Sequence, residues 1–420
     1  MKIAMIQPAL LRLGGGGRQI LSLAVELQKA GHEVEIFTTF VSERCYPELL
    51  KKVAVNVVPN PLIPFRQNSE SFISRSAASK EVNGASNLRG WFRRIVGREY
   101  YTTELPSMLS LGRNIPKGFD IINNHNCPTE WAAFVAKKRL KAPIVWMCNE
   151  PPFWFFAPEH KKGLRMINWP LFEVLDRTAV DYIDEIIVLS SIDAGYVRKA
   201  YDRPAKIIRT GVDIDLFHNA SKEEVRRKNG LENDFIILQV GNIAPDKRQG
   251  DSIMALYYLS KNYDNVKLII VGNEGGGSRG ELIRLSEKLG IKDKVLFWHG
   301  CSDEELAEVY AACDVFVFPA HITWGLAVIE AMAASKPVIV SKMCGASEII
   351  QSGVNGIVID NTNPEEWARQ IELLMNNPKL RKKLGENAYE YVSKNLSWEK
   401  YARNMARVFQ QAITSSRRNS

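Results

Sequence analysis

The 420-residue sequence lacks any hydrophobic run long enough to cross a membrane, because a spanning helix needs roughly 18 unbroken apolar residues. Apolar stretches such as the four residues from Phe235 to Leu238 end after a few positions. The first eight residues are too short and too soon interrupted to form the apolar core of a signal peptide. We therefore expect a protein that stays on the cytoplasmic side of the membrane.

Cysteine is also sparse, and no two cysteines are spaced as a CxxC pair. A small secreted scaffold would be much richer in cysteine, and a zinc site would show paired spacing. We expect reduced, mostly buried thiols and no metal site. The six cysteines are Cys45, Cys127, Cys148, Cys301, Cys313 and Cys344.

The composition is ordinary for a globular protein, but its charge is unevenly distributed. Hydrophobic residues make up 45% and charged residues 24%, which excludes collagen-like and largely disordered chains. The net charge is +8. Residues 1–210 hold 29 Lys or Arg against 20 Asp or Glu, whereas the remainder holds 26 against 27. A basic first half suggests an anionic partner, such as a membrane surface or a nucleic acid.

Apolar strand patterns alternate with amphipathic helix patterns along nearly the whole chain, in two series. In the first half, strands are predicted at 2–7, 34–39, 53–58, 121–124, 144–148 and 185–189, with helices such as 19–30 and 131–140. In the second half, strands are predicted at 235–240, 267–271, 295–298, 315–318 and 337–340. The helices between them are predicted at 249–260, 280–289, 303–312 and 325–334. Strand–helix alternation predicts an α/β protein with parallel sheets.

The alternation breaks between Gly211 and Asp234, where a turn and a polar stretch follow one another. We predict one domain over residues 1–211 and a second over 212–396. A last helix at 397–420 is expected to cross back to the first domain.

Residues 64–100 do not fit the alternation, and they include the basic, aromatic stretch from Arg89 to Arg98. A second aromatic cluster spans Pro151 to Phe156.

A run of four glycines, Gly14, Gly15, Gly16 and Gly17, separates the first strand from the first helix. Glycines at such a turn let backbone N–H groups approach a phosphate, and a helix N-terminus favours negative charge. The dinucleotide-binding spacing would need glycine at Gln19, and the second strand ends without an acid. The run therefore indicates anion binding rather than NAD binding, with a flexible turn as the alternative.

The second series carries two more groups at strand ends. Lys247 and Arg248 follow its first strand, where they could hold a diphosphate or simply be solvated charges at a helix start. Gly325 and Leu326 begin the helix after the fourth strand, and Glu330 lies one turn further among apolar residues. A carboxylate in that setting requires partners, and vicinal ribose hydroxyls would supply two.

Taken in order, these segments resemble the retaining, nucleotide-sugar-dependent glycosyltransferases of family 4. The segments are Gly14, Gly15, Arg18 and Gln19; Gly31 to Val34; Gly211 to Asp213 with Phe217; Gly241 to Lys247; Trp324 to Ala333; Lys336 to Ile339; and Gly345 to Ile350. The resemblance spans almost the whole chain. It implies two Rossmann-like domains facing across a cleft, the glycosyltransferase-B fold. The donor would bind the C-terminal domain and the acceptor the N-terminal one.

The resemblance also implies roles for single residues. Lys247, with Asn242 and Arg248 nearby, would bind the donor diphosphate together with the helix start at Gly325 and Leu326. Glu330 would hold the ribose. The glycine run would touch the phosphates or the transferred sugar, and His125, at a strand end, would contact that sugar. Lys247, Glu330 and His125 are thus the candidate catalytic residues, with no metal and no cofactor beyond a nucleotide sugar.

Three departures from the family pattern bear on the substrate. Asn242 and Gly17 stand where the family usually has Arg and Glu. Ile322 stands where the family has the first glutamate of an E-x7-E motif, which normally faces the donor sugar. His321 or Thr323 is the candidate for the missing hydrogen bond. Asp213 and Asp215 spell a DxD metal signature, but their place in the predicted turn favours a helix cap.

The predicted activity is transfer of a hexose from GDP-mannose or a UDP-sugar to a lipid-linked or other saccharide. The basic first half predicts a peripheral contact with an anionic membrane through Arg89, Arg93, Arg94 and Arg98, and the motif series argues against a nucleic-acid partner. Two alternatives remain: a catalytically silent binding subunit, which Ile322 suggests, and an epimerase of the same fold.

Overall fold

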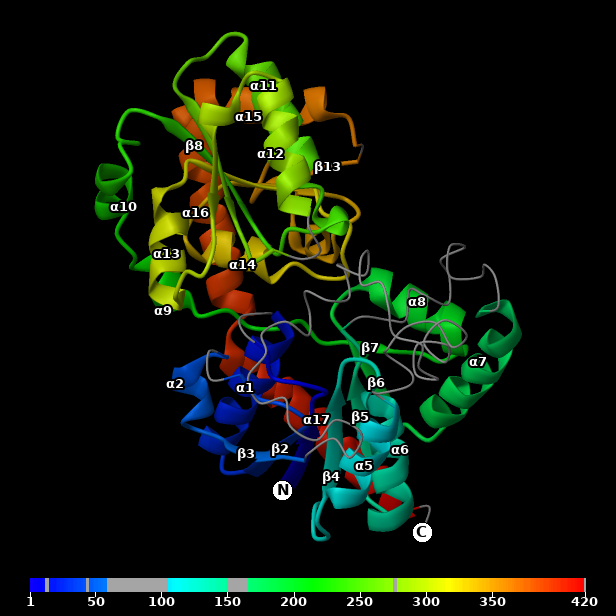
Figure 1. Cartoon of the computed structure of the whole chain (residues 1–420). Coiled ribbons are helices and arrows are strands. Elements are labelled where there is room, and N and C mark those ends of the chain that lie inside the picture. The colour runs from blue at the N-terminus through cyan, green and yellow to red at the C-terminus, as the bar shows by residue number, and fades with distance from the viewer. Residues whose placement is uncertain are drawn as a thin grey trace. The chain divides into compact units, whose positions relative to one another are not determined.

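A computed structural model describes residues 1–11, 15–42, 45–58, 105–149, 165–274, 278–360 and 362–418, without the side chains of 165–172 (Figure 1). The described chain forms two compact units. The N-terminal unit contains the described residues up to Thr210 and the last helix from Trp398, and the C-terminal unit contains Gly211–Ser397. Each unit has its own parallel sheet, covered by helices.

The sheet of the N-terminal unit has the order β3-β2-β1-β4-β5-β6-β7. All of its paired strands run parallel. The strands are β1 (Lys2–Ile6), β2 (Glu33–Thr38), β3 (Ala54–Val57), β4 (Ile121–His125), β5 (Ile144–Met147), β6 (Glu185–Val188) and β7 (Lys206–Ile207). The helices are α1 (Gly15–Lys29), α2 (Pro47–Leu50), α5 (Leu105–Asn114), α6 (Thr129–Leu140), α7 (Arg165–Asp181), α8 (Ser191–Tyr201) and α17 (Trp398–Arg418).

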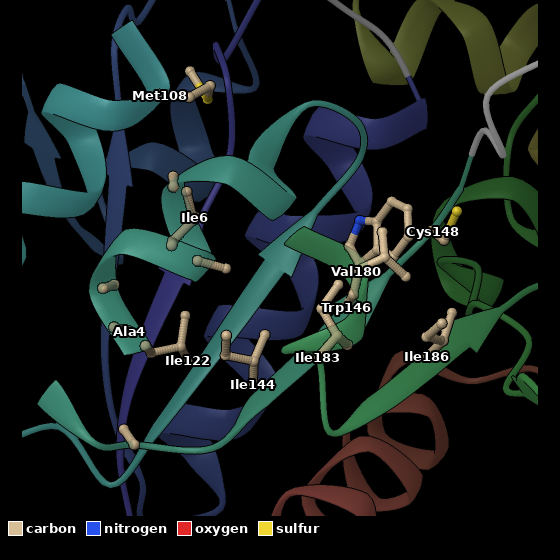
Figure 2. Close-up of a cluster of buried hydrophobic side chains, with 14 of the residues drawn as sticks. Ala4, Ile6, Met108, Ile122, Ile144, Trp146, Cys148, Val180, Ile183 and Ile186 are labelled. Atoms are coloured by element: carbon tan, nitrogen blue, oxygen red, sulfur yellow. The ribbon is translucent and has the colours of Figure 1, made fainter. Parts of the chain in front are cut away.

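One apolar core of this unit lies between the sheet and helices α5 and α6 (Figure 2). Alternate residues of each strand point to the same face of a sheet, so Ala4 and Ile6 of β1 join Ile144 and Trp146 of β5 in that core. Ile122 of β4 belongs to the same layer. By the same alternation, His125 points to the opposite face.

The last helix, α17, packs against α1 of the N-terminal unit. Its buried residues include Tyr401, Met405 and Phe409, four apart and therefore on one face. The Tyr401 hydroxyl accepts a hydrogen bond from Gln19 Nε2 of α1 at 3.0 Å, and both side chains are buried. The end of the chain is thus part of the N-terminal core.

The sheet of the C-terminal unit has the order β10-β9-β8-β11-β12-β13, again all parallel. The strands are β8 (Phe235–Val240), β9 (Val266–Val271), β10 (Val295–Trp298), β11 (Val315–Phe318), β12 (Val338–Ser341) and β13 (Ile357–Ile359). The α-helices are α9 (Ile214–His218), α10 (Glu223–Lys228), α11 (Gln249–Ser260), α12 (Ser278–Lys288), α13 (Asp303–Ala312), α14 (Leu326–Ala333), α15 (Pro364–Asn376) and α16 (Pro378–Asn395). Short 3₁₀ helices are η4 (Pro245–Lys247), η5 (Lys292–Lys294) and η6 (Gly345–Ile349).

The predicted fold class, two parallel α/β sheets, is confirmed. The strands β7 and β13 were not predicted, because runs of two and three residues carry too little pattern. One helix start was wrong: α1 begins at Gly15, not Gln19, so three of the four glycines form its first turn. None of the helices within the described ranges is long and apolar enough to span a bilayer.

Candidate active site

The predicted site residues fall at one kind of position in each sheet. In each sheet the first strand of the unit lies in the interior. The next two strands extend the sheet on one side of it, and the chain then returns to extend the sheet on the other side. At this reversal of strand order β1 neighbours β4, and β8 neighbours β11. Ligands of open parallel sheets bind at the carboxyl ends of strands where this reversal occurs. Gly15 to Gly17 and His125 lie at the β1–β4 reversal. The residues assigned to the donor lie at or just beyond the β8–β11 reversal.

The β8–α11 loop, residues 241–248, carries the two predicted cations. Lys247 Nζ lies 2.6 Å from Asp246 Oδ2, and Arg248 Nε donates to Asp251 Oδ2 at 2.6 Å. Their side chains are 22% and 28% exposed, so both are half-buried yet still reach solvent. Asn242 is exposed at the start of the loop. Two cations at a strand end can hold a diphosphate once a ligand competes with their carboxylate partners.

A backbone hydrogen bond joins this loop to the segment after β11. The His321 N–H donates to the Asp246 carbonyl at 2.9 Å. The ring of His321 is half-buried, and its Nε2 has no hydrogen-bond partner among the described residues. Burial, and secondarily the charge of Arg248, lowers the pKa of His321 below its ordinary value. A neutral ring with an unused nitrogen can donate to or accept from a sugar hydroxyl.

Helix α14 begins directly beside this segment. Its N-cap residue, Gly325, has φ 145°, and a Cβ there would lie 2.9 Å from Cys344 Sγ, so the position requires glycine. As a glycine, the N-cap residue has no side chain with which to cap the helix. The Val328 N–H donates to the Gly325 carbonyl at 3.0 Å, whereas the N–H groups of Leu326 and Ala327 precede the first carbonyl of the helix and favour an anion. Thr323, two residues before the cap, is 9% exposed.

Glu330 is a buried carboxylate on the second turn of α14. It is 5% exposed, and its Oε2 accepts a hydrogen bond from the Tyr310 hydroxyl at 2.9 Å. The same hydroxyl lies 3.1 Å from the Ala327 carbonyl, one turn earlier. Tyr310 therefore fixes the carboxylate against α13, which the sequence analysis did not foresee. Ile322, at the place of the expected glutamate, pairs with Cys344 in an isolated β-bridge.

At the β1–β4 reversal, amide side chains gather beside the start of α1. Asn126, with φ 61°, donates to Gln7 Oε1 at 3.2 Å, and Asn149 Nδ2 donates to Asn126 Oδ1 at 2.7 Å. Asn149 Nδ2 also bonds Gln19 Oε1, which links the cluster to α17. A Cβ on Gly16 would lie 3.0 Å from the Asn126 amide nitrogen. These amides were not predicted as site residues, although each lies at or within two residues of the end of a predicted strand.

His125, the last residue of β4, is fully buried. Its Nε2 lies 2.8 Å from Asn123 Oδ1, and its Nδ1 has no partner within the described part of the chain. Burial lowers the pKa of His125 to about 3, so the ring is neutral at physiological pH. A neutral ring can hydrogen-bond a sugar hydroxyl but brings no charge to the site.

Next to His125 in the chain, a buried acid pair joins α6 to α7. Glu130 is fully buried and accepts a hydrogen bond from the Cys127 thiol at 3.0 Å, whereas Asp176 accepts one from the Tyr201 hydroxyl at 2.7 Å. Burial and the charge of Asp176 raise the pKa of Glu130 well above its usual range. Burial raises the pKa of Asp176 to about 6, against the opposing effect of the Tyr201 hydrogen bond.

This pair predicts a stability that falls as the pH rises. Unfolded carboxyls titrate near pH 4, so below about pH 4 both states are protonated and the pair costs nothing. Between about pH 4 and about pH 6 the unfolded Asp176 has released a proton that the folded Asp176 retains, so stability falls over this range. Asp176→Asn, which keeps an acceptor for Tyr201, should raise Tm over wild type increasingly from pH 4 to pH 7. A Tm difference constant with pH would contradict this, and Asp202→Asn, at an exposed ion pair, is the control.

The structure bears on two further expectations. Among the described residues, no group of three His, Cys, Asp or Glu side chains is placed to hold a metal ion. Asp213 caps α9, because its side chain accepts a hydrogen bond from the Leu216 N–H at 3.2 Å, as the turn interpretation expected. Other predicted positions lie outside the described residues: Gly14, the basic, aromatic stretch with Arg89, Arg93, Arg94 and Arg98, and the 151–156 cluster.

Comparison with known proteins gives the family. Residues 13–216 match the model of "Glycosyltransferase Family 4", and residues 221–391 match that of "Glycosyl transferases group 1". A D-inositol 3-phosphate glycosyltransferase of Streptomyces bingchenggensis is 31% identical over 72% of this chain and 69% of its own length. One from Segniliparus rotundus is 25% identical over 97% of this chain and 86% of its own length.

A solved structure has the same fold. Anabaena HepE, crystallised with UDP and glucose, matches with a TM-score of 0.74 at 19% identity, over 98% of this chain and 100% of its own. The two parallel sheets, the two family models and the relatives all indicate the same family. The chain belongs to glycosyltransferase family 4 and is a glycosyltransferase.

Proposed function

We propose that the protein moves a hexose from a nucleoside diphosphate sugar to a saccharide acceptor with retention of configuration. The observation that carries the proposal is the β8–β11 reversal. There Lys247 and Arg248, the N-terminus of α14 and the carboxylate of Glu330 lie at or beside the carboxyl ends of adjacent strands. These groups match a diphosphate, whose charge needs cations and N–H groups, and a ribose, whose hydroxyls need an acceptor.

In the proposed reaction, the bond between the sugar and the diphosphate breaks, and the diphosphate leaves with additional negative charge. Lys247 and the N–H groups at the start of α14 stabilise this charge as it develops. The leaving phosphate takes the proton of the acceptor hydroxyl, which attacks from the same face of the sugar. His125, Gly15 to Gly17, His321 and Thr323 are the proposed contacts to the transferred sugar and its phosphates.

The acceptor is proposed to bind the N-terminal unit. Its amide cluster of Gln7, Asn126 and Asn149 offers donors and acceptors suited to hydroxyl groups. A lipid-linked saccharide at the cytoplasmic membrane face fits the basic composition of residues 1–210. The names of the relatives favour a second acceptor, D-inositol 3-phosphate, and the neighbour's UDP makes UDP-glucose the first donor to test beside GDP-mannose.

The experiment is a thermal-shift screen followed by a transfer assay. UDP-glucose or GDP-mannose should raise Tm, because a ligand that binds only the folded state stabilises it. The stabilising donor, labelled in its sugar, is then incubated with a lipid-linked saccharide in vesicles or with D-inositol 3-phosphate in solution. Label on either acceptor supports the proposal and names the acceptor class. A chain that neither responds to any nucleotide sugar nor consumes one would contradict it.

A further inference from the structure

Three polar side chains are buried directly beneath the β8–α11 loop. Gln239 of β8, Gln249 of α11 and Ser252 of α11 are 1%, 3% and 3% exposed. Gln239 Nε2 donates to the Lys247 carbonyl at 2.7 Å, and the Ser252 hydroxyl donates to Gln239 Oε1 at 2.8 Å. Gln249 Nε2 donates to the Asn242 carbonyl at 3.0 Å. Both ends of the loop are therefore held from the protein interior.

Packing alone does not account for a glutamine at position 239. Alternate residues of β8 share a face, and Phe235 and Ile237 on the face of Gln239 belong to an apolar core cluster. Burying an amide among such residues costs free energy unless every polar group finds a partner. An apolar side chain would fill the place without that requirement. The partners of Gln239, the Lys247 carbonyl and Ser252, therefore indicate what the glutamine does there.

The bond to Lys247 also lies where the backbone is strained. Arg248 has φ 54° and ψ 38°, a left-handed conformation that is unfavourable for a residue with a side chain. The carbonyl held by Gln239 belongs to the peptide that joins Lys247 to Arg248. Fixing that peptide opposes its relaxation and sets the direction in which both cationic side chains leave the loop.

We propose that Gln239, supported by Ser252, is a positioning residue that holds Lys247 and Arg248 in the geometry that binds the donor diphosphate. Gln249 does the same for the other end of the loop at Asn242. This inference rests on the proposed function, because it assumes that the loop binds a nucleoside diphosphate. It predicts that loss of the buried bonds weakens nucleotide binding, although none of these side chains lines the site.

The test compares UDP affinity in three variants of the full chain, measured by calorimetry well below each Tm, with GDP as a second probe. Gln239→Leu should raise Kd at least about tenfold, because it removes both buried hydrogen bonds, and Ser252→Ala about threefold, because it removes only the supporting one. Ser286→Ala is the matched control. Ser286 is also a helical serine, 1% exposed, with its hydroxyl 2.8 Å from the Ile283 carbonyl, but it does not contact the loop. Its Kd should equal that of wild type.

The outcomes separate the two proposals. Folded Gln239→Leu and Ser252→Ala variants that bind UDP and GDP as tightly as wild type would overturn the positioning role and leave the proposed function standing. A wild-type chain that binds neither nucleotide would overturn both. If Gln239→Leu does not fold, the comparison of Ser252→Ala with the control Ser286→Ala decides. Weaker UDP binding in Ser252→Ala alone, at an equal loss of Tm in the two variants, requires an effect on the loop.

Discussion

Replacing Lys247 by alanine should lower kcat by about 30- to 1000-fold while the protein stays folded. This corresponds to an increase of roughly 2–4 kcal/mol in the activation free energy. The reason is that negative charge grows on the leaving diphosphate, so a cation beside it binds the transition state more tightly than the ground state. The ion pair of Lys247 with Asp246 is partly exposed, so its loss should change stability by no more than about 1 kcal/mol.

The measurement is kcat for sugar transfer together with Tm. Lys294→Ala is the matched control, because Lys294 is 20% exposed and faces Asp264 at 3.8 Å, yet it lies at the amino end of β10, away from the site. The control should keep the wild-type kcat. A folded Lys247→Ala variant with unchanged kcat would show that Lys247 does not stabilise the leaving group.

Replacing Glu330 by glutamine should weaken UDP binding by about tenfold to a hundredfold, since hydrogen bonds to a charged acceptor contribute roughly 1.5–3 kcal/mol. The neutral amide is a poorer acceptor for ribose hydroxyls than the carboxylate. If Glu330 bonds the ribose, the affinity for 2′-deoxy-UDP should change much less than the affinity for UDP. Calorimetry with both nucleotides measures the difference.

Tyr310→Phe separates this role from a structural one. It removes the hydroxyl that donates to Glu330 but leaves the carboxylate in place. If Glu330 serves only to anchor α14 to α13, both variants should lose Tm and neither should lose UDP affinity. Equal losses for UDP and its 2′-deoxy form in Glu330→Gln would also contradict a bond to the 2′-hydroxyl.

Much of the proposed donor site could be predicted from local pattern. Lys247 and Gly325 follow strands whose ends were predicted closely, and β8, β10 and β11 were predicted with the bounds that the structure shows. Period and turn residues are properties of neighbouring positions, so a single sequence reveals them. The start of α1 was wrong because a glycine run has poor intrinsic helix propensity, which packing against β2 and α17 overrides.

Other features became visible only in the fold. The bond from the His321 N–H to the Asp246 carbonyl joins residues 75 positions apart, and it exists because β8 and β11 are neighbours in the sheet. From the sequence, Gln239 was only one residue of an apolar strand. A parallel strand that is buried on both faces has no alternation of polar and apolar residues, so nothing in the pattern singles out the glutamine. The amide cluster around Asn126 likewise requires β1, β4 and β5 to be adjacent.

The sequence by itself therefore determined the two α/β series, the motifs at their strand ends and the family resemblance, because each depends on residues close together in the chain. Only the tertiary structure decided which strand ends meet, which buried groups hold the β8–α11 loop, and that Tyr401 of α17 meets Gln19 of α1. These depend on pairings between distant residues, and hydrophobic pattern selects which face of an element is buried without specifying the partner that covers it.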